Sequence, residues 1–159
     1  MQKPVIGVLA LQGAVQPHKP HIEAAGGIFK AVKTADDFAQ VDGFILPGGE
    51  STTMLKLIDI FGLEAPLKAA FAEKPVWGIC AGAILMARHV NNPAQKSFGL
   101  IDMDVTRNAY GRQLESTIIA VEGYNASYIR APVIERVGSD VDVRATRNGK
   151  PIWVRQGMY

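Results

Sequence analysis

Residues 76–86 read VWGICAGAILM, and this stretch decides the fold that the rest of the chain must fit. A short apolar segment follows Pro75, Cys80 lies between Gly78 and Gly82, and a second apolar segment comes next. This order predicts a strand, a sharp turn and a helix with the cysteine at the turn, which is a nucleophile elbow. The two glycines supply the small neighbours that such a turn requires. A thiol at a helix N-terminus lies at the positive end of the helix dipole, which favours the thiolate.

Cys80 is the single cysteine of the sequence. A lone cysteine is often a buried structural residue that behaves as a small apolar side chain. The Gly-x-Cys-x-Gly frame favours a reactive thiol instead. A single cysteine excludes an intrachain disulfide framework, which is typical of a reducing compartment. We therefore expect a cytoplasmic protein.

The composition is that of an ordinary globular chain. The 159 residues suit one domain, and 48% of them are hydrophobic and 20% charged. A net charge of +2 is too small to predict binding to nucleic acid or to an anionic membrane. The apolar residues 5–11 are too few to span a bilayer and end without a convincing signal-peptide cleavage site, so we expect a buried first strand.

The first half of the chain alternates strand-like and helix-like segments. Strands are expected at residues 5–11, 28–32, 43–46 and 76–79, and helices at 21–25, 35–40, 51–61, 63–72 and 81–90. Such alternation predicts an α/β fold of three layers, flavodoxin-like, in which helices cover both faces of a mostly parallel central sheet.

The second half is rich in short strand-like segments. They lie at residues 101–107, 117–121, 128–129, 141–145 and 152–155. Asn148-Gly149 predicts a hairpin turn between the last two segments. Residues 91–96 and 122–127 are expected to be surface loops. We expect these to be antiparallel strands that are added to the main sheet or folded against it, within one domain over residues 1–159.

A second glycine-rich turn follows the third predicted strand. Residues 46–53 read LPGGESTT, and adjacent glycines let backbone N–H groups face a ligand. Ser51 or Thr52 can cap the following helix. Pro-Gly-Gly also suits an ordinary turn, but the carboxyl ends of parallel strands meet at one edge of a sheet, which favours a shared site with Cys80. The turn is not a Walker P-loop, because no Gly-Lys-Ser/Thr follows.

Five motifs together carry a family resemblance. They are GVLALQG at residues 7–13, LPGGESTTM at 46–54, GICAG at 78–82, RNAYGRQ at 107–113 and IRAP at 129–132. On these motifs the chain resembles the PdxT family, the glutaminase subunits of pyridoxal 5′-phosphate synthase, within the class I glutamine amidotransferases. The elbow alone would indicate only the wider superfamily, and the other motifs narrow the resemblance.

The resemblance implies a reaction without a metal or cofactor. Cys80 would attack the side-chain carboxamide of L-glutamine, ammonia would leave, and water would release glutamate from the thioester. Backbone N–H groups of Ala81 and of Gly48 or Gly49 would hold the oxyanions. The ammonia would pass to a PdxS-type synthase subunit in a hetero-oligomer.

The resemblance also implies a glutamine pocket, whose residues would be Gly49, Glu50, Ser51, Arg107, Ile129 and Arg130. Glu50 suits the α-ammonium of glutamine, and an arginine suits its α-carboxylate. Which arginine makes that ion pair is left open. Arg130 can contribute through its backbone, and Arg107 can serve the fold or a partner contact.

The family's triad pairs the cysteine with a histidine and a glutamate in a His-Pro-Glu segment after the last strand. Residues 156–159 read QGMY, and the triad His and Glu are not among the residues given. We expect a fragment that is inactive for lack of its base. His18, His21 and His89 are expected to be surface or docking residues, with His89 two turns along the predicted helix from Cys80 and directed away from it.

Two other functions compete with the glutaminase. A non-catalytic, glutamine-binding regulatory subunit would keep the pocket and lack the triad. An elbow cysteine that senses oxidants is disfavoured, because the Gly-Gly-Glu-Ser turn suits an amino-acid ligand.

The two prolines Pro17 and Pro20 predict a late start for the first helix, since proline disrupts a helix interior.

Overall fold

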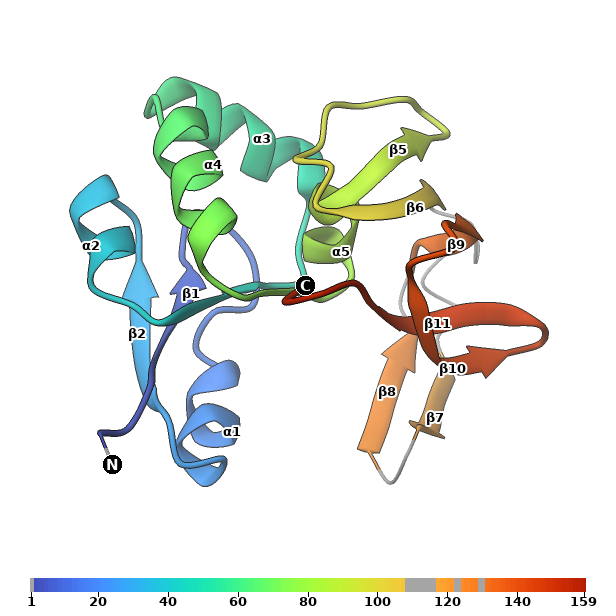
Figure 1. The fold of residues 1–159 in the computed structure, drawn as a ribbon, viewed down its shortest axis with the longest axis horizontal. Coiled ribbons are helices and arrows are strands. Elements are labelled where there is room, and N and C mark those ends of the chain that lie inside the picture. Colours follow the sequence, from blue (N-terminus) through green and yellow to red (C-terminus); the bar gives the residue numbers. More distant parts are fainter. Residues whose placement is uncertain (1, 108–116, 122–123, 129–130) are drawn as a thin grey trace. The chain divides into compact units, whose positions relative to one another are not determined.

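Figure 1 shows the computed structural model, which describes residues 2–107, 117–121, 124–128 and 131–159. The chain divides into two compact units, one of residues 1–85 with Met158 and one of residues 86–157 with Tyr159. This division does not test whether residues 1–159 form the single domain that the sequence predicts, so that domain stays a prediction.

The first unit is built on a parallel sheet of four strands in the order β2-β1-β3-β4. The strands are β1 (Val5–Leu9), β2 (Ile28–Val32), β3 (Gly43–Leu46) and β4 (Val76–Gly78). Val8 of β1 pairs with Ala31 of β2 and with Ile45 of β3. The predicted parallel sheet is confirmed, and β1 ends two residues before the predicted residue 11.

The first unit contains four helices and all but the last residue of a fifth. They are α1 (His18–Ala24), α2 (Ala35–Ala39), α3 (Ser51–Ile60), α4 (Glu64–Glu73) and α5 (Ala81–Met86). The predicted late start of the first helix is wrong, because Pro17 is its N-cap and Pro20 falls within its first turn. A proline there removes an N–H that has no helical partner, so the helix tolerates it.

Helices cover both faces of the first sheet, as a pair of neighbouring side chains on β3 shows. The ring of Phe44 packs edge-on against Phe38 of α2 at 5.9 Å and against Phe71 of α4 at 5.3 Å between centroids. Ile45 packs with Val8 and with Ile22 of α1. Adjacent residues of a strand point to opposite faces, so α2 and α4 cover one face and α1 the other, which confirms the three-layer prediction.

The predicted helix over residues 81–90 is wrong in its second half. Helix α5 ends at Met86, and strand β5 (Ala87–Asn91) follows at once. In β5, Val90 pairs with Val105 of β6 (Ile101–Thr106) in a parallel ladder. Residues 87–91 read ARHVN, and their two apolar residues, three positions apart, also fit one face of a helix. Pairing with β6 decides for a strand. His89 therefore lies on a strand.

The second unit consists of strands in small sheets of its own. Strands β5, β6 and β9 (Val133–Val137) form one sheet in the order β5-β6-β9, with β6 and β9 antiparallel. Antiparallel hairpins join β7 (Thr117–Val121) to β8 (Tyr124–Tyr128), and β10 (Asp142–Arg147) to β11 (Lys150–Arg155). The antiparallel strands expected in this half are confirmed, but they form sheets of their own and do not extend the β2-β1-β3-β4 sheet.

The turns of the second unit test two predictions. Asn148 and Gly149 have φ values of 49° and 75°, as a two-residue hairpin turn requires, so the predicted turn is confirmed. The loop predicted over residues 122–127 is wrong for residues 124–127, which pair with β7. Residues 122, 123 and 129 lie outside the described residues.

Within the described part of the chain, every helix is too short or too polar to cross a membrane.

Candidate functional site

Cys80 occupies a strained turn between β4 and α5. Its φ of 53° lies in the left-handed region, which residues other than glycine rarely adopt. The N–H of Ile79 donates to the carbonyl of Leu46 at 3.0 Å, and the N–H of Gly82 donates to that of Ile79 at 2.9 Å. These bonds fix the backbone on both sides of a cysteine that is partly exposed. The geometry is that of a nucleophile elbow.

Gly82 is required by close packing of the elbow against β3. A Cβ on Gly82 would lie 2.0 Å from the carbonyl oxygen of Leu46. A contact that short with backbone cannot be relieved by a side-chain rotation. Glycine is therefore sterically required at position 82, two residues after Cys80.

The glycine-rich turn lies beside the elbow. Leu46, the last residue of β3, pairs with Gly78, the last residue of β4, so both turns leave the same edge of the sheet. A Cβ on Gly48 would lie 3.7 Å from the Cβ of Cys80. The structure thus brings together the two turns that the sequence placed at one sheet edge.

The loop after β1 supports the glycine-rich turn. The N–H of Ala14 donates to the carbonyl of Gly48 at 2.9 Å. The side-chain Oε1 of Gln12 accepts from the N–H of Glu50, also at 2.9 Å. A Cβ on Gly49 would lie 2.5 Å from this Oε1. Gln12 is a residue to which the sequence assigned no role, because nothing local links it to a turn 38 positions away.

Glu50 is the N-cap of α3. Its Oε1 accepts from the N–H of Thr52 at 3.3 Å and from the Thr52 hydroxyl at 2.9 Å. Ser51 is the first helical residue and is buried. The predicted cap, Ser51 or Thr52, is wrong, because both already lie within the helix and the Glu50 carboxylate accepts from the N–H of Thr52.

The remaining predicted pocket residues belong to the second unit. Arg107 follows β6, is 7% exposed, and donates its N–H to the carbonyl of Asn91 at 3.0 Å. Ile129 and Arg130 lie outside the described residues. The roles of these three residues stay predictions.

The three histidines lie on two different elements. His18 and His21 are on α1, where burial and then the charge of His21 lower the pKa of His18. His89 is on β5, with its Nδ1 at 2.9 Å from Oδ1 of Asp104. His89 thus takes part in an ion-pair cluster.

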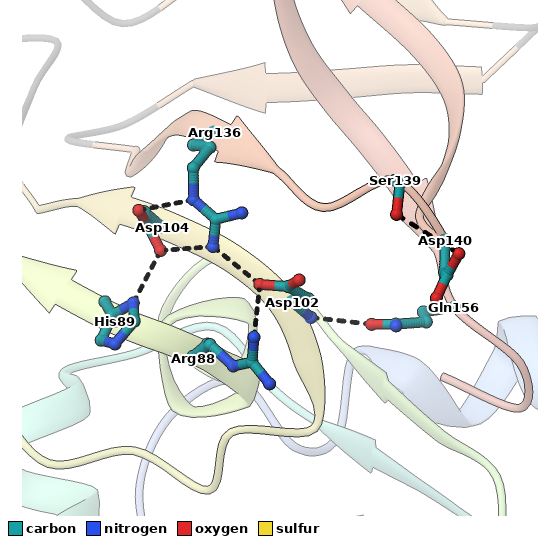
Figure 2. Close-up of polar contacts among 8 residues, drawn as sticks. All are labelled: Arg88, His89, Asp102, Asp104, Arg136, Ser139, Asp140 and Gln156. Carbon is teal, nitrogen blue, oxygen red and sulfur yellow. Dashed lines mark hydrogen bonds and ion pairs between the residues drawn. The ribbon is translucent and has the colours of Figure 1, made fainter.

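This cluster spans the β5-β6-β9 sheet, as Figure 2 shows. Arg136 of β9 donates to Oδ2 of Asp104 at 2.8 Å and to Oδ1 of Asp102 at 2.7 Å. Arg88 of β5 contacts Oδ1 of Asp102 at 3.1 Å. Two carboxylates face two guanidinium groups, so the charges balance across three strands. Among the described residues, no group of three or more His, Cys, Asp or Glu side chains is placed to hold a metal ion.

The cluster predicts a pH dependence of stability. Hydrogen bonding to Arg136, more than the other effects, lowers the pKa of Asp104 from 3.8 to about 2. A carboxyl whose pKa is lower when folded stabilises the fold above its unfolded pKa. That stabilisation is lost as the pH falls from about 4 to about 2. Asp104→Asn should therefore lower the free energy of unfolding at pH 5, with a difference from wild type that shrinks by pH 2.5.

Urea unfolding at both pH values measures this effect. Asp142→Asn is the control, because Asp142 contacts Arg144 two residues away in the same hairpin strand and crosses no sheet. An equal loss for the two variants at pH 5 would contradict the role given to Asp104.

Known proteins resemble this chain both in sequence and in structure. A model of the SNO glutamine amidotransferase family matches residues 8–159. Pyridoxal 5′-phosphate synthase subunit PdxT of Koribacter versatilis is 46% identical over 158 residues, which cover 96% of this chain and 82% of the relative. The same subunit of Geobacillus thermodenitrificans is 47% identical, covering 97% and 83%. A solved glutamine amidotransferase structure superposes with a TM-score of 0.87 at 38% identity, covering 96% of this chain and 85% of the other.

Proposed function

Because the chain belongs to the SNO glutamine amidotransferase family, we propose that it acts as a glutaminase that releases ammonia from L-glutamine for pyridoxal 5′-phosphate synthesis. The observation that carries the proposal is the partly exposed Cys80 at φ 53°, with the Gly48 turn beside it. An exposed nucleophile and a neighbouring backbone turn are what acyl transfer from an amide requires.

The chemistry starts at the thiolate of Cys80. The sulfur attacks the side-chain carbonyl carbon of glutamine, and the carbonyl π electrons move to oxygen to give a tetrahedral oxyanion. When the oxyanion collapses, the nitrogen takes up the proton that the thiol lost on ionising, the C–N bond breaks and ammonia leaves. Water then attacks the γ-glutamyl thioester through a second oxyanion, which releases glutamate and restores the thiol.

Backbone N–H groups of the two turns would stabilise the oxyanions. Ala81, the first residue of α5, supplies one donor, as the residue after the nucleophile does in other elbows. We assign the second to Gly49 and not to Gly48. The carbonyl of Gly48 is bound to the N–H of Ala14, and a trans peptide directs the following N–H to the opposite side. One such donor contributes about 10²–10³ in rate.

Two residues at the start of α3 are proposed to bind glutamine, Glu50 and Ser51. Glu50 would bind the α-ammonium, and Ser51 would contribute the wall beside it. Arg107, Ile129 and Arg130 are proposed from the family resemblance. An arginine suits the α-carboxylate of glutamine, and Arg107 and Arg130 are the two candidates.

The general base is assigned to none of the three histidines of this chain. His89 is bonded to Asp104 on the sheet of the second unit. His18 and His21 lie on α1, which covers the face of the first sheet. Cys80 is thus proposed as the nucleophile, and the role of base is not assigned to any of these histidines.

The ammonia is proposed to pass to a synthase subunit in a hetero-oligomer, since the PdxT relatives are subunits of pyridoxal 5′-phosphate synthase. A single cysteine in the sequence supports a reducing, cytoplasmic location. Release next to a synthase would keep the ammonia from being lost to solvent.

Affinity labelling tests the proposed function. The diazoketone analogue of glutamine, 6-diazo-5-oxo-L-norleucine, should add covalently to Cys80, and L-glutamine should protect the thiol. Intact mass and peptide mapping measure the adduct. Absence of labelling, or labelling that L-glutamine does not slow, would refute the proposal.

Gln12 gives a second prediction at this site. Gln12→Ala removes the acceptor for the N–H of Glu50 and frees the turn that carries Gly49. The labelling rate should fall about fivefold, the equivalent of about 1 kcal/mol for one hydrogen bond. Gln16→Ala, on the same loop and exposed, is the control and should label at the wild-type rate. Equal rates for the two variants would contradict the supporting role of Gln12.

A further inference from the structure

The carboxylate of Glu50 accepts two hydrogen bonds from Thr52. Oε1 accepts both the N–H and the hydroxyl of Thr52, at 3.3 Å and 2.9 Å. The backbone of Glu50 is fixed separately, because its N–H donates to Gln12. Main chain and side chain of this glutamate are therefore both tied in place, although the residue is exposed.

We propose that Thr52 is a positioning residue, which sets the carboxylate of Glu50 to receive the α-ammonium of L-glutamine. The inference rests on the proposed function, which gives Glu50 that ligand. A carboxylate has about four lone-pair positions on its two oxygens, so the two bonds from Thr52 do not exhaust its capacity.

Positioning matters because an exposed glutamate side chain is otherwise free to rotate. Immobilising such a side chain on binding costs conformational entropy. Thr52 meets part of that cost before the ligand arrives, since its hydroxyl already selects the conformation. Glutamine gains from this arrangement through its ammonium, and a ligand without an ammonium gains nothing.

The same contact also caps α3, and a cap alone would have a different consequence. If Thr52 only stabilised the helix, its loss would loosen the whole turn, and every ligand of the pocket would bind less well. If Thr52 positions Glu50, its loss weakens only those ligands that carry an α-ammonium. A pair of ligands therefore separates the two roles.

The test uses L-glutamine and 4-carbamoylbutanoate, which is glutamine without its α-amino group. The readout is the concentration of each that halves the rate at which iodoacetamide alkylates Cys80. Thr52→Val keeps the shape of the side chain and removes the hydroxyl. It should weaken L-glutamine about fivefold, the equivalent of one exposed charge-assisted hydrogen bond, and leave 4-carbamoylbutanoate unchanged.

Two matched variants complete the design. Thr52→Ser restores the hydroxyl and should restore the affinity for L-glutamine. Thr53→Val makes the same change at the next exposed position of α3 and should leave both ligands unchanged. Unaltered L-glutamine affinity in Thr52→Val, or equal weakening of both ligands, would overturn the inference.

Glu50→Gln distinguishes failure of this inference from failure of the proposed function. If Glu50→Gln abolishes the preference for L-glutamine over 4-carbamoylbutanoate while Thr52→Val retains it, Glu50 binds the ammonium and Thr52 does not position it. If neither ligand protects Cys80 in the wild-type chain, the proposed function itself is wrong.

Discussion

Cys80→Ser should abolish covalent labelling by 6-diazo-5-oxo-L-norleucine and any release of ammonia from glutamine. Serine is nearly the same size, but its hydroxyl is not ionised near neutral pH, whereas a thiol forms a nucleophilic anion readily. We expect a loss on the order of a thousandfold or more, because a nucleophile acts in every step of the reaction. Intact mass spectrometry and a glutamate assay measure the two losses.

The control for this variant is Ala83→Ser, which adds a hydroxyl on the same helix, α5, three residues further on. It should be labelled as fast as wild type. Cys80→Ser should also keep its affinity for L-glutamine, measured by thermal shift, since the pocket residues are unchanged. Labelling of Cys80→Ser at the wild-type rate would show that the thiol is a structural residue and not the nucleophile.

The site at the sheet edge could be predicted because its signals are local. Cys80 lies in a five-residue frame with two glycines. The other turn, Pro47-Gly48-Gly49, directly follows the apolar residues 44–46. Strands β2 and β3 were predicted with the bounds that the structure has, since each is a short apolar run with clear ends. Parallel strands then put both turns at one edge of the sheet.

What could not be predicted depends on partners far along the chain. Strand β5 was taken for helix, because its two apolar residues, Ala87 and Val90, also fit one face of a helix and the sequence does not show the pairing with β6. Strand β9 was missed, and with it Arg136, which reaches Asp104 across 32 positions. The support of Glu50 by Gln12 is of the same kind.

One local contact was also misread. A serine or threonine is the usual helix cap, yet Glu50 caps α3 and Thr52 donates to it. Which of several polar neighbours becomes the cap depends on where the helix begins, and helix ends are set by packing as much as by sequence. Here buried Ser51 and Met54 fix the first turn of α3 against the core.

Gly82→Ala should unfold the first unit or greatly weaken it, although the same change in most helices is stabilising. Glycine inside a helix usually costs about 1 kcal/mol relative to alanine. At this position a Cβ would lie 2.0 Å from the carbonyl oxygen of Leu46 and 2.6 Å from its carbonyl carbon. Relief requires β3 and the elbow to separate, which would break the bond from Ile79 to Leu46. We expect a loss of about 3 kcal/mol or more in the free energy of unfolding.

Gly48→Ala is the matched control, since it makes the same change in the other turn at this sheet edge. There a Cβ would be 3.7 Å from the Cβ of Cys80, an ordinary van der Waals contact, so the variant should stay folded. Urea unfolding at neutral pH compares the two, and the labelling rate of Cys80 should fall with Gly82→Ala because the elbow moves with Leu46. A Gly82→Ala variant as stable as wild type would mean that β3 and the elbow are not in the tight contact that sets Cys80 in its strained conformation.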